Sequence, residues 1–161
     1  FKSKIKICYE KKLLGTAGTL LNNISSINKD LIFLHADNYT NDNLKEFVTA
    51  HKNRPSCCLM TMLNFRTSEP KKCGIIKVDK DRIMTSFVEK PKTNIGNLAN
   101  GAIYIMSKKF INEFALNFSS SEDFSADVLP NCTGKVYTYE TKNFFIDIGS
   151  PESLDLANKI K

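Results

Sequence analysis

The feature that most restricts the fold of this chain is the alternation of strand-like and helical runs in its first third. Residues 30–38, DLIFLHADN, form a short apolar run ended by turn residues, which is typical of a strand buried on both faces of a parallel sheet. Residues 40–53 repeat apolar side chains at helical spacing, and residues 57–63 form another buried strand. This alternation requires crossover connections, so we expect an α/β fold: a mostly parallel sheet with helices on both faces.

The chain opens on an alternating run as well. Residues 4–10 alternate apolar and polar side chains, which predicts a strand, and residues 13–24 predict a tight turn that opens into a short helix. The chain begins with Phe rather than Met, and the predicted strand follows within a few residues. We therefore expect residues 1–161 to be a single domain that lacks its N-terminal part.

The rest of the chain changes character. Residues 73–90 predict two strands joined at a polar DKD turn, and residues 101–106 predict another strand. A helix is expected over 107–118, and two strands over 135–149. The last helix is expected to begin after Ser150, a good N-cap that is followed by a proline.

The composition of the chain limits the kinds of molecule that it could bind. The chain of 161 residues is 42% hydrophobic and 25% charged, close to the globular average, so a sizeable core is possible. Its net charge of +6 favours anionic partners such as phosphates and nucleotides. The basic residues form no block, which argues against nucleic acid as a partner. No apolar run approaches the roughly 20 residues that a membrane span needs.

Cysteine and histidine usage points to a reducing compartment and away from a thiolate metal site. The five cysteines are odd in number and contain no CxxC pair, so we expect free thiols and a cytoplasmic protein. The two histidines, His35 and His51, offer no ligand spacing to these cysteines.

Three strand ends carry residues that could act on a ligand, because open α/β sheets bind ligands beyond the carboxyl ends of their strands. The small residues Gly15, Thr16, Ala17 and Gly18 would let the backbone approach a flat or charged group at a helix N-terminus. The alternative is a plain tight turn, since the segment matches neither GxGxxG nor a P-loop.

Asp37 and Asp147 end two strands that are far apart in sequence. They could meet over one Mg²⁺ ion, which prefers a few carboxylates together with substrate phosphates. The alternative is that each is a turn or cap residue. After the DKD hairpin, Lys90 could reach a phosphate and Glu89 could accept hydrogen bonds from sugar hydroxyls. An exposed ion pair of little energetic value is the alternative there.

Taken in order, six segments resemble the sugar-1-phosphate nucleotidyltransferases, and the resemblance spans about Ile7 to Ala157. The segments are YEKKLLGTAGTL, HADN, CGIIKVDKDRIMTSFVEKP, NGAIYI, DFSADVLP and FFIDIGSPESLDLA. The chain looks most similar to the short mannose- or heptose-1-phosphate guanylyltransferase type. The resemblance implies the Rossmann-like nucleotide-diphospho-sugar transferase fold, here without its first βα unit.

The resemblance also implies roles for individual residues. Asp37 and Asp147 match the acids that hold Mg²⁺, and Lys90 matches the lysine that grips the sugar phosphate. The residues implied to hold the nucleobase are Glu10, Gly15, Thr16, Ala17 and Gly18. Those implied to line the sugar pocket are Gly74, Glu89, Asn100 and Gly101.

The implied reaction joins an NTP and a sugar 1-phosphate into an NDP-sugar and pyrophosphate. Among nucleotides, GTP is slightly favoured. The sequence does not determine the oligomeric state, and a homo-oligomer is compatible with it. The chain has no match to the family's glycine-rich GGxGTRL loop, so we expect these 161 residues alone to be inactive or nearly so. The rival hypotheses are a GT-A-type glycosyltransferase and a non-catalytic module that binds a sugar phosphate or nucleotide.

Overall fold

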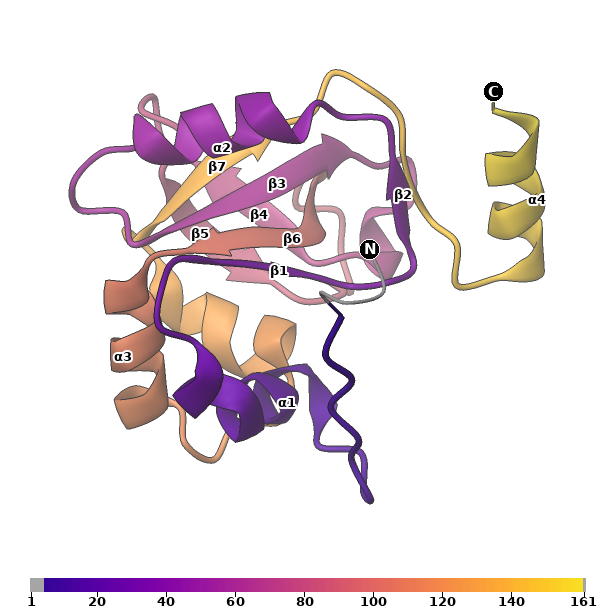
Figure 1. Ribbon diagram of the computed structural model, residues 1–161. Helices are drawn as coiled ribbons and strands as arrows, with labels where there is room; N and C mark the ends of the chain where they lie inside the picture. The colour runs from indigo at the N-terminus through magenta and orange to yellow at the C-terminus, as the bar shows by residue number, and fades with distance from the viewer. Residues whose placement is uncertain (1–4, 161) are drawn as a thin grey trace.

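A six-stranded sheet and a two-stranded ribbon organise the chain (Figure 1). The computed structural model describes residues 5–160. The sheet consists of β1 (Leu31–Leu34), β3 (Met60–Arg66), β4 (Ile75–Val78), β5 (Met84–Val88), β6 (Leu98–Met106) and β7 (Val136–Glu140). The ribbon pairs β2 (Asn38–Thr40) with β8 (Phe145–Asp147) in antiparallel register. It therefore brings two distant parts of the chain side by side.

The direction of β6 corrects the expectation of a mostly parallel sheet. β6 lies between β3 on one side and β1 and β4 on the other, and it is antiparallel to all three. β1, β3, β4 and β7 thus run in one direction, yet β3 with β7 is the one parallel pairing in the sheet described by residues 5–160. Part of the reason is the short β4–β5 hairpin, whose connection is too short for a crossover helix and so gives an antiparallel pair; β6 then inserts between β4 and β3, antiparallel to both.

Within residues 5–160, four α-helices and four shorter helical turns precede, separate or follow the strands. The α-helices are α1 (Gly15–Asn23), α2 (Leu44–Lys52), α3 (Lys108–Asn117) and α4 (Pro151–Lys159). The shorter turns are η2 (Ile24–Ser26), η3 (Pro70–Lys72), η4 (Phe124–Val128) and η5 (Leu129–Cys132). The predicted cap of the last helix is confirmed, because the Ser150 hydroxyl accepts the backbone N–H of Ser153 at 3.1 Å.

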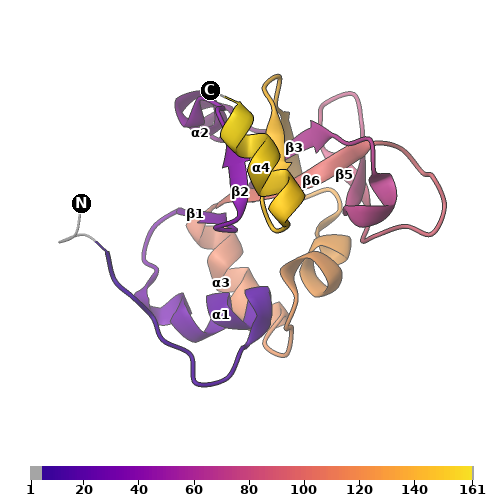
Figure 2. The ribbon, with the colours of Figure 1, turned by 90° about the vertical axis from the view of Figure 1, so that its right-hand side faces the viewer.

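Helices cover both faces of the sheet, as the sequence predicts (Figures 1 and 2). α1 and α3 lie on one face, where they pack against a core cluster that includes Met62, Tyr104 and Phe114. α2 lies on the other face, where Leu63 and Ile105 are buried. The alternation of Met62 and Leu63 between the two clusters is the period-two pattern of a strand buried on both faces.

The predicted strand at residues 4–10 is wrong over the part that the structure describes. Residues 5–10 have no regular structure, and Ile5, Ile7 and Tyr9 are exposed. Residue 4 lies outside the described residues. An alternating pattern forms a strand only where a neighbour pairs with it, and within residues 5–160 nothing pairs with this segment.

The structure also describes the state of the cysteines and the length of the helices. All five cysteines are free thiols, as predicted; Cys58 and Cys132 are buried. No helix within residues 5–160 combines the length and the apolar character that crossing a membrane requires.

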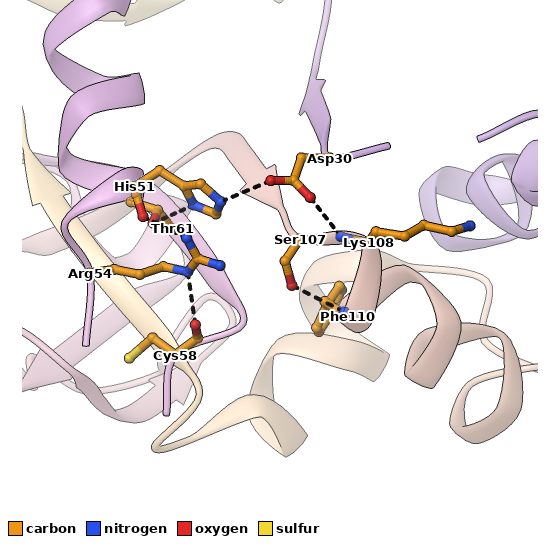
Figure 3. A network of polar contacts seen from close by, with 8 residues as sticks. All are labelled: Asp30, His51, Arg54, Cys58, Thr61, Ser107, Lys108 and Phe110. Atoms are coloured by element: carbon orange, nitrogen blue, oxygen red, sulfur yellow. Dashed lines mark hydrogen bonds and ion pairs between the residues drawn. The ribbon is translucent and has the colours of Figure 1, made fainter. Parts of the chain in front are cut away.

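A buried histidine connects α2 to the start of β1 and of α3 (Figure 3). His51 is 4% exposed; its Nδ1 lies 2.8 Å from the Thr61 hydroxyl and its Nε2 lies 3.9 Å from an Asp30 carboxylate oxygen. The other Asp30 oxygen accepts the backbone N–H of Lys108 at 2.8 Å. Burial lowers the pKa of His51 to about 4; Arg54 adds to this shift and Asp30 opposes it. His51 is therefore neutral near pH 7.

Candidate active site

The residues predicted to hold a sugar phosphate lie together around one cavity of about 270 Å³. The cavity lies where β4 and β6 begin and where β5 and β8 end. The predicted residues that line it are Gly74, Glu89, Lys90, Asn100, Gly101 and Asp147. The structure therefore gathers residues from four separate segments at one place.

Asp37 and Asp147 are neighbours across the β2–β8 ribbon. Asn38 pairs with Asp147, and the N–H of Ile148 donates to the Asp37 carbonyl at 2.8 Å. A Cβ placed on Gly149 would lie 2.8 Å from Asp147 Oδ1 and 3.9 Å from Asp37 Oδ2. Both carboxylates thus border the same point.

The two acids have the donor chemistry that a hard divalent cation takes. Asp37 and Asp147 both line a cavity of about 660 Å³, and Asp147 also lines the smaller one. Mg²⁺ is commonly held by one or two carboxylates, with waters and substrate phosphates as its other ligands, so this pair fits it. No group of three or more His, Cys, Asp or Glu residues between residues 5 and 160 is placed to hold a metal.

Glu89 and Lys90 form a loose ion pair at the cavity, with 4.0 Å between Oε1 and Nζ. The side chain of Lys90 is 68% exposed, so its ammonium is free to meet a ligand phosphate. Lys90 has φ +43°, a left-handed conformation that a non-glycine residue rarely adopts, and its N–H donates to the Cys73 carbonyl at 3.1 Å. The pKa of Glu89 is raised above its usual value, because burial raises it more than the nearby charge of Lys90 lowers it.

Gly74 lets the chain pass close to Glu89. A Cβ at this position would lie 2.7 Å from Glu89 Oε2 and 2.5 Å from Cζ of Phe87. Neither distance leaves room for a methyl group, so any larger residue must displace one of these side chains. Gly74 therefore fixes the place of the Glu89 carboxylate.

A bulge in β6 shapes the opposite wall. Leu63 pairs with Ile103 and the next residue of β3 pairs with Asn100, so Gly101 and Ala102 have no partner on β3. Ala102 has φ +50°. The Asn100 side chain holds this conformation, because its Oδ1 accepts the N–H of Ala102 at 2.9 Å while its Nδ2 donates to the Tyr104 hydroxyl at 2.7 Å.

Several residues at the cavity were missed by the sequence reasoning. Asn38 anchors the bulge, since its Nδ2 donates to the Gly101 carbonyl at 2.9 Å. Phe65 and Phe145 stack with ring centroids 4.5 Å apart and line both cavities, as does Cys73. Asn38 directly follows Asp37, which was a usable signal. The aromatic pair comes from strands 80 residues apart in sequence, and no local pattern could have paired them.

The segment predicted to hold the nucleobase lies against η4. Gly15 has φ +74° and approaches the carbonyl of Glu122 closely, and the N–H of Ala17 donates to the same carbonyl at 2.9 Å. Thr16 Oγ1 accepts the N–H of Phe124 at 2.8 Å. None of Gly15, Thr16, Ala17 and Gly18 lines the 270 Å³ cavity. This geometry meets the requirements of a tight turn that opens a helix.

Glu10 sits before that turn. Its Oε2 accepts the N–H of Leu14 at 3.4 Å, and its Oε1 is buried without a hydrogen-bond partner in the described chain. A buried carboxylate oxygen without a donor is costly unless a ligand supplies one. The Glu10 carboxylate is therefore available to accept a hydrogen bond.

Comparison with known proteins identifies the family to which the chain is similar. The family model described as "Nucleotidyl transferase" matches residues 1–160. The chain is 31% identical over 155 residues to a glucose-1-phosphate adenylyltransferase of Clostridium acetobutylicum, and 30% identical over 144 residues to a putative mannose-1-phosphate guanyltransferase of Sulfolobus acidocaldarius. These alignments cover 89% and 88% of this chain.

Solved structures agree. HddC from Yersinia pseudotuberculosis, crystallised in complex with GMP-PN, superposes with a TM-score of 0.76 at 27% identity and covers 100% of this chain and 69% of that one. A putative glucose-1-phosphate thymidylyltransferase from Bacillus anthracis superposes with a TM-score of 0.76 over 94% of this chain and 62% of that one, at 19% identity. These neighbours confirm the α/β, Rossmann-like fold class.

The chain belongs to the nucleotidyl transferase family. Within that family it is similar to sugar-1-phosphate nucleotidyltransferases, which confirms the resemblance seen in the six ordered segments. The chain spans about two-fifths of the length of these two curated relatives, 41% of one and 39% of the other.

Proposed function

We propose that this protein takes part in nucleotidyl transfer, in which an NTP and a sugar 1-phosphate give an NDP-sugar and pyrophosphate. One observation carries the proposal: the adjacent Glu89 and Lys90 surround a single cavity together with Asp147, which lies far from them in the chain. That combination offers a cation for a phosphate, an acceptor for hydroxyls and a carboxylate for a metal.

Each residue has a role that follows from its position. Lys90 neutralises the phosphate of the sugar substrate, which is the attacking group. Glu89 accepts hydrogen bonds from sugar hydroxyls, and the backbone at Gly74 and Gly101 forms the walls. A phosphate oxygen is already ionised near neutral pH, so the sugar phosphate can attack the α-phosphorus in line without a protein nucleophile or general base. Positioning and charge neutralisation supply the catalysis.

Asp37 and Asp147 would hold Mg²⁺ between the two substrates. Bound there, the ion would neutralise phosphate charge and orient the reacting groups. The adjacency of the two acids across the β2–β8 ribbon supports this assignment. Their shared border on the 660 Å³ cavity leaves space beside them for a triphosphate.

For the nucleotide, we propose that Glu10 and the turn of Gly15, Thr16, Ala17 and Gly18 contact the base. The unpartnered Glu10 oxygen could accept a base N–H. GTP is our first choice, supported by similarity to HddC, whose structure holds GMP-PN, and to the Sulfolobus relative. The Clostridium relatives are adenylyltransferases, so a direct comparison of GTP with ATP binding tests this choice.

We also propose that the reaction takes place in the cytoplasm. The support is the presence of five cysteines that all remain free thiols, two of them buried. Free thiols are usual in reducing compartments. Fractionation of the native cell, with the protein followed by antibody, tests this assignment.

The direct test is calorimetric titration of the chain with mannose 1-phosphate and glucose 1-phosphate. We expect Lys90→Ala to weaken binding by about tenfold or more, because it removes a charge-assisted contact. Lys92→Ala is the matched control, since it removes an equal charge two residues away on a side chain that does not line the cavity. Equal effects of the two substitutions would refute the proposed phosphate contact.

A second measurement separates binding from turnover. Because no segment of these 161 residues matches the glycine-rich loop, we expect sugar 1-phosphate to bind while pyrophosphate release from GTP or ATP stays near background. Robust turnover would show that the loop is dispensable. Absence of sugar phosphate binding would count against the site itself.

A further inference from the structure

Another cavity of about 270 Å³ shares no lining residue with either of the two cavities of the candidate active site. It lies between β3, β7 and the β4–β5 hairpin. Pockets for drug-sized ligands occupy about 300–1,000 Å³, so this one suits a smaller metabolite. The residues that matter for its chemistry are Asn64, Arg82, Thr138, Glu140 and Lys142.

Asn64 is the unusual member of this lining. It is 1% exposed, and both its Nδ2 and its Oδ1 lack a hydrogen-bond partner in the described chain. Two residues earlier on the same strand, Met62 belongs to the apolar core. Burying an amide without partners costs free energy that an apolar residue would not. A ligand that both donates and accepts would satisfy Asn64.

The charges around the cavity favour an anion. Arg82 and Lys142 line it, and neither side chain forms an ion pair or hydrogen bond with the part of the chain that is described. The carboxylate of Glu140 is already engaged, since its two oxygens accept from the Arg66 guanidinium at 2.8 and 3.1 Å. The two cations are therefore the charges left to interact with a ligand.

The backbone around Arg82 is firmly held. Arg82 has φ +61°, and its carbonyl accepts both the N–H and the hydroxyl of Thr138 at 2.9 Å. Asp79 fixes the turn from the other side, because its Oδ1 accepts the N–H groups of Asp81 and Ile83. The rare conformation is thus imposed by hydrogen bonds, and it places Arg82 beside the cavity.

We propose that this cavity binds a small hydroxylated anion, with a phosphate or carboxylate group between Arg82 and Lys142. The Asn64 amide then donates to an anion oxygen through Nδ2 and accepts from the neighbouring hydroxyl through Oδ1. The proposal depends on the lining of this cavity alone and is independent of the proposed nucleotidyl transfer.

Calorimetric titration of the full chain with glycerol 3-phosphate, glycerate and inorganic phosphate tests the proposal. Tighter binding of the first indicates a phosphate ligand and tighter binding of the second a carboxylate ligand. The better of the two should exceed binding of inorganic phosphate, which has no carbon-bound hydroxyl. We expect Arg82→Ala to weaken the better probe by at least about tenfold, as loss of a charge-assisted hydrogen bond does. Lys77→Ala, on the same hairpin but outside the cavity lining, should leave it unchanged.

Asn64→Leu gives a readout that does not depend on a lost charge. This variant removes the unpartnered amide, so we expect it to abolish binding of the probe while the melting temperature holds or rises. Lys90→Ala should leave probe binding intact. Failure of both hydroxylated probes to bind the wild-type chain would overturn the proposal. Binding that survives Arg82→Ala and is lost in Lys90→Ala would overturn it too, because the anion would then lie in the candidate active site.

Discussion

At the scale of single residues, Gly74 is a position where the site tolerates little change. A methyl group there would press on Glu89 Oε2 and on the Phe87 ring. We expect Gly74→Ala to weaken sugar 1-phosphate binding about tenfold, because the Glu89 carboxylate must move away from the hydroxyls it accepts. Calorimetry measures this, and Glu89→Gln should show a loss of similar size. Unchanged affinity in Gly74→Ala would mean that Glu89 does not contact the sugar.

His51 makes stability depend on pH. Its pKa is about 4 in the folded protein and 6.5 when unfolded, so below pH 6.5 the unfolded chain binds a proton that the folded chain does not. We expect this group to lower the free energy of unfolding by roughly 2–3 kcal/mol as pH falls from 6.5 to 4, with little further change below.

Urea denaturation across that pH range measures the effect. The matched variant is His51→Gln, whose amide can still meet the Thr61 hydroxyl but does not titrate. The difference in unfolding free energy between wild type and variant should shrink as pH falls from 6.5 to 4. A difference that stays constant with pH would show that His51 is not held neutral.

At the scale of elements, a side-chain hydrogen bond joins the β6 bulge to the β2–β8 ribbon. Asn38, on the ribbon, donates to the carbonyl of Gly101 in the bulge. We expect Asn38→Ala to cost about 1 kcal/mol of stability and to weaken sugar 1-phosphate binding, since the bulge loses its anchor. Asn41→Ala is the control, since Asn41 is an exposed residue of the following connection whose side chain makes no hydrogen bond within residues 5–160. Equal behaviour of the two variants in melting and titration experiments would contradict this coupling.

The elements also show which parts of the fold can be predicted from local sequence patterns. The DKD hairpin turn and the Ser150 cap were predicted, because each depends on a few adjacent residues. The direction of β6 was not, since Leu98–Met106 reads the same in a parallel or an antiparallel sheet. The prediction of a strand over residues 5–10 was wrong for a related reason. An alternating pattern is compatible with a strand, but it does not show whether a neighbouring strand is present to pair with it.

The same distinction applies to the candidate site. Six of the predicted residues line one cavity. Glu89, Lys90 and Asp147 stand at the ends of strands, which can be located in the sequence. Gly74, Asn100 and Gly101 were implied only by the family resemblance. Phe65 and Phe145 come together only through tertiary packing, and the cavity beside Asn64 also forms only in the folded chain. No local sequence pattern indicates either arrangement. The segment Gly15–Gly18 matched a family pattern, yet its geometry also fits the plain turn that its spacing alone allowed.

At the scale of the whole molecule, the account depends on Asp37 and Asp147 lying beside the cavity that Lys90 lines. The ribbon that pairs their strands and the common border at Gly149 are the geometric basis for this. We therefore expect a phosphate held by Lys90 to lie close to a metal held by the two acids.

Phosphorus NMR of bound mannose 1-phosphate, with Mn²⁺ in place of Mg²⁺, tests that proximity most directly. The paramagnetic ion broadens the phosphorus signal only when it is bound nearby. The account predicts strong broadening in the wild type, its loss in Asp147→Asn, and its retention in Asp155→Asn, which removes an exposed charge on α4. A mannose 1-phosphate signal that shows binding yet stays sharp with Mn²⁺ in the wild type would contradict the account.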